Sequence, residues 1–315
     1  MAAPLTRRRA IVILAAAFGF SPLTARSAPE AVRWRGVMLG APCAIDLYHP
    51  DRGRAKASLD AALAAARRLE GLFSLYQPQS ALRQLNRAGA LVAPAPDFVA
   101  LLRAAQDYTR LTGGAFDPTV QPFFTLLSRH FSTPDADPNG PSQGDWEAAR
   151  ARVGAHHLIV ADDRVVLLGG AQVTLNGIAQ GYVTDRVASI FAEAGLANAL
   201  VDMGEIRALG ARPDGAPWSV GLEAPDGAIW KRIDCKDRAV ATSAGGGFVF
   251  DRAGRFNHIF DPGTGACAHR SRAVAVAAPT ATAADALSTA FTLLPPEEII
   301  RISGEIEGVT THLAA

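Results

Sequence analysis

Lysine and excess charge are both scarce in this chain of 315 residues. Nearly all of its basic residues are arginines, and its formal net charge is +1. A balance so close to neutral gives no electrostatic basis for nucleic acid or an anionic surface as the partner. Genomic composition bias explains the arginine content, which does not by itself indicate a phosphate site.

Cysteine is also rare, and the two commonest nucleotide motifs are missing. Cys43, Cys235 and Cys267 form no Cys-x-x-Cys pair, which makes zinc and thioredoxin-like chemistry poor explanations. One disulfide or three unpaired thiols would both be consistent with this spacing. Neither Gly-x-Gly-x-x-Gly nor the Gly-x-x-x-x-Gly-Lys-Ser/Thr pattern occurs, so the common nucleotide-binding folds are not indicated.

What the chain does contain is apolar sequence: 49% of its residues are hydrophobic and 19% are charged. That composition is typical of a globular protein and not of a disordered one. We find no internal repeat and no low-complexity tract. We expect residues 29–315 to form a single domain.

The N-terminus has the features of an export signal. A basic segment at 6–9, with arginine at 7–9, precedes an apolar run at 10–20, which is short for a membrane span, and small residues follow at 25–28. We therefore expect residues 1–28 to be a cleaved signal peptide and the mature chain to be periplasmic. Paired arginines favour twin-arginine export over an ordinary secretory signal. No cysteine lies at the cleavage region, so a lipoprotein anchor is not supported.

Hydrophobic periodicity predicts helices and strands without a strict strand–helix alternation, which favours the α+β class. The helices that we expect are 55–72, 98–111, 178–194 and 283–294, the last one stopped by Pro295-Pro296. The strands that we expect lie within 32–48 and at 157–160, 165–168, 199–203, 218–222, 239–242, 256–260 and 272–277. Residues 132–143 are rich in Pro, Asp and Gly, which predicts a surface loop.

The last predicted helix carries a carboxylate and a hydroxyl one turn apart. Asp285 and Thr289 are four residues apart, so a helix places both on one face. Both are hard oxygen donors, and Mg²⁺ takes a few such donors and completes its shell with water and phosphate. An acidic residue in a first helical turn is more often a cap or a dipole partner. The magnesium hypothesis therefore needs support from the rest of the chain.

Four further clusters supply that support, because each combines glycines with polar residues where a structural segment would not need them. Glycines let the backbone approach a ligand closely, and a helix N-terminus presents free N–H groups to phosphate. An ordinary cap, turn or structural histidine would explain any one of them alone. The clusters are residues 112–119, 175–182, 241–247 and 257–265.

In this order, from about residue 38 to residue 294, the clusters resemble the ApbE family of FAD:protein FMN transferases. The resemblance implies an ApbE-like, T-fold-type architecture of mixed sheets flanked by helices, with an FAD cleft between two halves. It also implies Mg²⁺-dependent transfer of FMN from FAD to a threonine hydroxyl, with release of AMP. The matching motifs are Met38-Leu39-Gly40, Leu75-Tyr76-x-x-x-Ser80, residues 113–119, Gly177-Ile178-Ala179-x-Gly181-Tyr182, Asp185, His258-Ile259-x-Asp261-Pro262-x-x-Gly265 and Ala284-Asp285-Ala286-Leu287-x-Thr289-Ala290.

The resemblance assigns roles to particular residues. It implies that Mg²⁺ is held by the Gly177 carbonyl, Asp285 and Thr289. Asp285 and, more weakly, His258 and Asp261 are candidates for the general base. The residues expected to contact FAD are Met38, Tyr76, Ala115, Phe116, Asp117, Thr174, Gln180, Ile259 and Ser288.

The chain departs from the family pattern at a few of these positions. Thr174 stands where the family usually has Asp, and Gln180 where Lys is common. Gly204-Glu205 replaces Gly-Gly, and Ser243-Ala244 replaces Ser-Gly. Two alternatives remain open: an FAD pyrophosphatase of the same fold that gives FMN and AMP, or a non-catalytic flavin-binding assembly protein, which Thr174 and Gln180 would favour.

The acceptors that the resemblance implies are membrane respiratory flavoproteins with a flavinylation motif containing Ser or Thr. They include the Na⁺-translocating quinone reductase, Rnf complexes and regulators of nitrous-oxide reduction. The twin-arginine-like signal favours the last of these.

Overall fold

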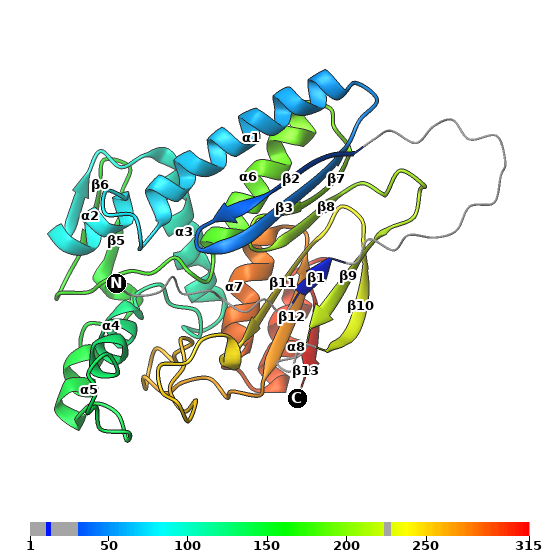
Figure 1. Ribbon diagram of the computed structural model, residues 1–315. Helices are drawn as coiled ribbons and strands as arrows, with labels where there is room; N and C mark the ends of the chain where they lie inside the picture. The colour runs from blue at the N-terminus through cyan, green and yellow to red at the C-terminus, as the bar shows by residue number, and fades with distance from the viewer. Residues whose placement is uncertain (1–10, 14–30, 224–227, 315) are drawn as a thin grey trace.

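A seven-stranded antiparallel sheet forms the centre of the computed structural model, which describes residues 11–13, 31–223 and 228–314 (Figure 1). The strand order is β13-β12-β11-β8-β7-β3-β2. In chain order the strands are β2 (Ala31–Met38), β3 (Ala41–Tyr48), β7 (Asn198–Asp202), β8 (Ile206–Leu209), β11 (Ala239–Ala244), β12 (Ala273–Ala278) and β13 (Thr310–Ala314).

Both faces of the central sheet are covered, which explains why several of its strands are apolar throughout. Along β12, Val274 and Val276 point into the larger core, whereas Ala275 and Ala277 point into a second core on the opposite face. The second core is closed by apolar residues of β9 and β10, and β1 pairs with β9 at the edge of the same three-stranded sheet, whose order is β1-β9-β10. Its strands are β1 (Ile11–Ile13), β9 (Trp218–Glu223) and β10 (Ile229–Cys235).

Three helices cover the larger core: α1 (Arg52–Phe73), α6 (Ala179–Glu193) and α7 (Ala281–Phe291). In Figure 1, α1 and α6 lie over the part of the sheet that contains β2 and β7, and α7 lies beside β11 and β12. Helix α1 buries a stripe of Ala and Leu at helical spacing, and the Asp51 side chain accepts a hydrogen bond from the Arg54 N–H at its start.

The remaining elements lie at the edges of this framework. A small sheet of order β4-β6-β5 accompanies helices α2 and α3, and α4 and α5 form a third core with aromatic residues of the 248–267 segment. The bounds are α2 (Ala81–Ala88), β4 (Ala90–Val92), α3 (Pro96–Leu111), α4 (Gln121–His130), α5 (Gln143–Arg150), β5 (Leu158–Val160), β6 (Arg164–Leu167) and α8 (Pro296–Glu305).

The α+β class is confirmed, and each of the four expected helices is present within a few residues of its predicted bounds. The strand expected at 256–260 is wrong, because this segment forms only isolated bridges, Val249 with Asn257 and Phe260 with Cys267. The Asn257 side chain instead holds it, donating to the Ala268 carbonyl at 2.7 Å. Phe256 and Phe260 of this segment pack into the third core and not into a sheet.

Helix α7 ends at Phe291, before the expected stop at Pro295-Pro296, and Pro296 is instead the first residue of α8, where its missing N–H costs nothing. All three cysteines are free. The predicted signal, residues 1–28, lies outside the described residues except for strand β1. In the described ranges, no helix is both long and apolar enough to span a membrane.

Candidate functional site

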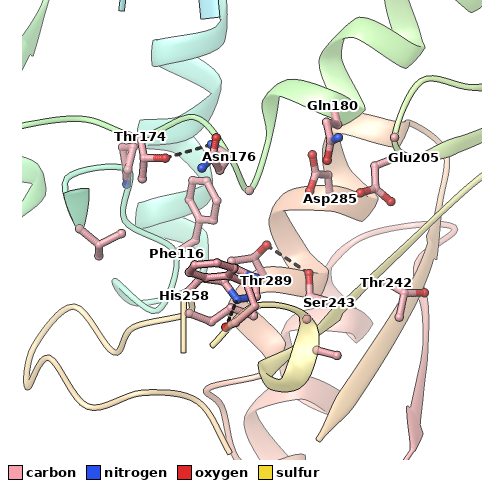
Figure 2. Close-up of a pocket in the computed structure, with 18 of the residues that line it drawn as sticks. Phe116, Thr174, Asn176, Gln180, Glu205, Thr242, Ser243, His258, Asp285 and Thr289 are labelled. Atoms are coloured by element: carbon pink, nitrogen blue, oxygen red, sulfur yellow. Dashed lines mark hydrogen bonds between the residues drawn. The ribbon is translucent and has the colours of Figure 1, made fainter. Parts of the chain in front are cut away.

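A cavity opens where the start of α6, helix α7, the end of β11 and the 112–119 turn meet (Figure 2). One part of its wall is aromatic and the other is rich in carboxylate, hydroxyl and amide groups. The polar lining residues are Tyr76, Asp117, Gln121, Thr174, Asn176, Gln180, Asp202, Glu205, Thr242, Ser243, His258, Asp285 and Thr289, and the apolar ones include Phe116, Phe124, Phe248, Ile259 and Phe260.

Asp285 lies on α7 and is held by the N-terminal turn of α6. Its side chain is 2% exposed, and Oδ2 accepts a hydrogen bond from the Gly181 N–H at 3.0 Å. The partial positive charge of a helix N-terminus favours a carboxylate at this place. Position 181 requires glycine because a Cβ atom would lie 2.3 Å from the Ala281 carbonyl oxygen. The absence of a side chain therefore lets the two helices approach closely enough for this contact.

A second contact one turn further along α6 fixes the start of α7. The Asp185 carboxylate accepts hydrogen bonds from Ala281 N at 2.8 Å, from Thr282 N at 2.8 Å and from Thr282 Oγ1 at 2.7 Å. Arg207 donates to the same carboxylate at 2.7 Å. Because backbone N–H groups at a helix start have no partner within the helix, Asp185 acts as an external cap for α7.

Thr289 lies one turn after Asp285 and faces the loop that leads into α6. A Cβ atom added to Gly177 would lie 2.9 Å from Thr289 Oγ1, so the backbone of Gly177 passes directly against this hydroxyl. The structure thus brings the three predicted metal ligands, Gly177, Asp285 and Thr289, to one cavity. Within the described ranges, no three His, Cys, Asp or Glu side chains gather into a metal-binding group.

The 112–119 turn carries a buried carboxylate whose geometry is set by its own neighbours. Asp117 Oδ1 accepts hydrogen bonds from Thr119 N at 2.8 Å and from Thr119 Oγ1 at 2.6 Å. Burial raises the pKa of the Asp117 carboxyl, although the hydrogen bonds from Thr119 act in the opposite direction. Gly113 and Gly114 have φ values of 60° and 93°, which suit glycine and end α3 as expected.

His258 lies beside the aromatic part of the wall. Its Nδ1 is 3.2 Å from the Phe248 carbonyl oxygen, and the centroids of the His258 and Phe248 rings are 6.3 Å apart. Phe248 in turn stacks on Phe124, with ring centroids 6.1 Å apart. The Ile259 N–H donates to the Asn257 side chain at 3.1 Å, which fixes the backbone next to the histidine.

At the opposite end, Figure 2 shows the side chains of Gln180, Glu205 and Asp285 lying close together. Gln180 is buried, and its amide packs on Gly204, where a Cβ atom would lie 2.5 Å away. Gly204 has a φ of 120°, a second reason for glycine there. Thr174 Oγ1 accepts a hydrogen bond from the Asn176 N–H at 3.2 Å, so Thr174 orders the loop that precedes Gly177.

Most of the predicted site residues line this cavity: Tyr76, Ala115, Phe116, Asp117, Thr174, Gly177, Gln180, His258, Ile259, Asp285 and Thr289. Met38 is buried in the core, although its neighbour Leu39 lines a small adjoining pocket that shares Tyr76 and Gln180 with the cavity. Ser288 is fully buried behind the cavity wall, and its Oγ lies 2.8 Å from Ser243 Oγ. Ligand contacts of Met38 and Ser288 stay predictions.

Several residues in the cavity wall were not among the predicted site residues. Asp202 is the last residue of β7, Glu205 lies in the turn that follows, and Ser243 is the last residue but one of β11, so polar residues at strand ends were the available signal. Phe124 and Phe248 carried no such signal, because apolar helix and loop residues are ordinarily core.

Comparison with known proteins assigns the chain to a family. The ApbE family profile matches residues 39–312. FAD:protein FMN transferases from Treponema pallidum and Salmonella typhimurium are each 30% identical, with 87% and 93% of this chain aligned to 81% and 89% of theirs.

Solved structures agree with the sequence relatives. Flavin transferase ApbE from Vibrio cholerae superposes with a TM-score of 0.76 at 25% identity, covering 91% of this chain and 97% of that one. The ApbE protein from Thermotoga maritima gives a TM-score of 0.79 at 28% identity, covering 90% and 94%. The chain therefore belongs to the ApbE family and has the α+β fold of its solved members.

Proposed function

We propose that this chain transfers FMN from FAD to a threonine hydroxyl of an acceptor flavoprotein, with Mg²⁺ as the metal and AMP as the second product. The observation that carries the proposal is the cavity wall, which joins an aromatic part around Phe116 and Phe248 to an oxygen-rich part around Asp285 and Thr289. FAD has a matching division, since its rings are apolar and aromatic whereas its centre is a pyrophosphate. The relatives named FAD:protein FMN transferase support the same assignment.

The donors in this wall fit a hard divalent cation. Asp285 offers a carboxylate, Thr289 a hydroxyl, and Gly177 a backbone that lies directly against that hydroxyl. Oxygen donors of this kind suit Mg²⁺, which also keeps sites for water and phosphate. Bound there, the metal would neutralise charge on the pyrophosphate oxygens.

The electrostatics of the wall also favour a cation. Four carboxylates line the cavity, those of Asp117, Asp202, Glu205 and Asp285. A pyrophosphate that approaches them needs a counter-charge, since like charges repel strongly where water is excluded. The N-terminal turn of α6 adds partial positive charge at the same place.

The reaction forms a bond between the acceptor threonine oxygen and the FMN phosphorus and breaks the bond from that phosphorus to the bridging oxygen of AMP. The threonine proton must pass to a base. The Phe248 carbonyl can only accept, so the contact with His258 Nδ1 needs a proton on Nδ1, and the neutral ring then has its lone pair on Nε2. His258 Nε2 is then the candidate base, and Asp285 remains a metal ligand.

The test is to incubate the mature chain with FAD, Mg²⁺ and a candidate acceptor domain, and to follow the acceptor mass and AMP together. A Mg²⁺-dependent FMN adduct with equal AMP supports the proposal, and an acceptor with threonine replaced by alanine should give none. FMN and AMP released without acceptor would identify a pyrophosphatase. Tight FAD binding without turnover would identify an assembly protein.

We also propose that the mature chain acts in the periplasm on a membrane respiratory flavoprotein, with regulators of nitrous-oxide reduction as the favoured class. The basic and apolar residues at 6–20 support export. Fusion of residues 1–40 to a reporter that is active only outside the cytoplasm tests the location. Flavinylation of an acceptor that carries a Ser/Asp-Gly-Ala/Ser-Thr segment tests the partner.

A further inference from the structure

Three hydroxyl groups run from the interior of the protein to the cavity wall. Ser288 Oγ is fully buried and donates to the Asp285 backbone carbonyl at 3.0 Å. Ser243 Oγ lies 2.8 Å from Ser288 Oγ and 3.3 Å from Thr289 Oγ1. Figure 2 shows the last contact as a dashed line between Ser243 on β11 and Thr289 on α7. The series thus joins the backbone of one predicted metal ligand to the side chain of another.

Each hydroxyl has a single proton to donate, so the donor and the acceptor of each of these hydrogen bonds can be assigned in turn. A carbonyl oxygen cannot donate, and the Ser288 proton is therefore committed to Asp285. Ser288 Oγ can then only accept from Ser243, which uses the Ser243 proton. In the contact between Ser243 and Thr289, Thr289 must consequently be the donor.

This direction determines what Thr289 presents to the cavity. When its proton points at Ser243, the lone pairs of Thr289 Oγ1 are left for the cavity side. A cation needs a lone pair and is repelled by a hydroxyl proton. Without Ser243, the Thr289 hydroxyl would be free to rotate and to point its proton into the cavity.

We propose that Ser243 is a positioning residue that orients the Thr289 hydroxyl as an acceptor for the metal. The inference rests on the proposed Mg²⁺ site and adds a residue that does not itself bind the metal. Hydrogen-bond partners behind a metal ligand commonly change metal affinity by about 10–100-fold when removed. Ser243 is well placed for this role because its strand is fixed in the central sheet, where Ser243 pairs with Val274.

The experiment compares four variants of the full chain by titrating Mg²⁺ calorimetrically in the presence of FAD without acceptor. Ser243→Ala should weaken Mg²⁺ binding by about 10-fold or more, and Ser243→Thr, which keeps the hydroxyl, should restore most of it. Ser303→Ala is the matched control, because Ser303 Oγ also lies 3.0 Å from a threonine hydroxyl, that of Thr311, but outside the cavity. It should bind Mg²⁺ as the unchanged chain does. Asp285→Ala should abolish binding.

The variants separate failure of this inference from failure of the proposed function. If Asp285→Ala abolishes Mg²⁺ binding and Ser243→Ala leaves it unchanged, the role of Ser243 is overturned and the metal site stands. If the unchanged chain does not bind Mg²⁺, both are overturned. Melting temperature is recorded for each variant, and a loss of Mg²⁺ affinity in Ser243→Ala at an unchanged melting temperature supports positioning over a general structural role.

Discussion

The Gly181 N–H donates to Asp285 Oδ2 at 3.0 Å, and this contact joins α6 to α7 inside the cavity wall. It depends on the missing side chain of Gly181, since a Cβ atom there would lie 2.3 Å from a backbone oxygen of α7. The close approach of α6 and α7 thus sets the position of the Asp285 carboxylate. A change in the distance between these helices should therefore change the affinity for Mg²⁺.

Gly181→Ala should therefore weaken both folding and Mg²⁺ binding. The added methyl group meets backbone that cannot rotate away, which costs about 1–3 kcal/mol by overpacking. Gly304→Ala in α8 is the control, because nothing lies within 4 Å of a Cβ atom at that position. That substitution should be neutral or stabilising by about 0.5–1 kcal/mol. Urea unfolding and Mg²⁺ titration of both variants measure the difference, and equal behaviour would contradict the packing argument.

Asp185→Asn should loosen the start of α7. The carboxylate accepts three hydrogen bonds from Ala281 and Thr282 and one from Arg207, whereas an amide would turn its NH₂ group toward some of these donors. We expect a loss of about 1–3 kcal/mol in the free energy of unfolding. Asp163→Asn, in an exposed pair with Arg164, should leave the urea midpoint unchanged. A wild-type midpoint for Asp185→Asn would show that this cap does not stabilise α7.

Asp117→Asn should stabilise the fold near neutral pH at the expense of function. Burial raises the pKa of Asp117 above its ordinary value of 3.8, so the folded state binds the proton more tightly than the unfolded state does. The stabilisation that this shift contributes is fully present at pH values below 3.8, and it is lost as the pH rises through the raised pKa of Asp117. Asn keeps an oxygen for Thr119 but carries no charge. Urea midpoints should favour the variant at about pH 7, and this advantage should disappear at acidic pH. A constant difference across pH would contradict the assignment.

Thr289→Val and Thr289→Ser separate the hydroxyl from the shape of the side chain. Valine keeps the volume but offers no oxygen, and we expect Mg²⁺ affinity to fall by about 10-fold or more. Serine keeps the oxygen and should remain within a few-fold of the unchanged chain. The account would be contradicted if Thr289→Val bound Mg²⁺ normally and Thr289→Ser did not.

Local patterns in the sequence were sufficient for the helices and for most of the central sheet, because each has a clear period or a glycine stop. The strand prediction at 256–260 failed, because Asn257 satisfies backbone groups there with its side chain in place of a strand partner. The site residues were found mainly through the family resemblance. Contacts such as Ser243 with Thr289 join segments 46 positions apart, and no local pattern reports them.

The most direct measurement of the central claim is FMN transfer by Asp285→Asn at saturating FAD and a range of Mg²⁺ concentrations, with circular dichroism confirming that the variant is folded. The account predicts that the unchanged chain forms a Mg²⁺-dependent FMN adduct with matching AMP, and that Asp285→Asn is slower by about 10-fold or more. Transfer by Asp285→Asn at the wild-type rate and with the wild-type Mg²⁺ dependence would contradict it.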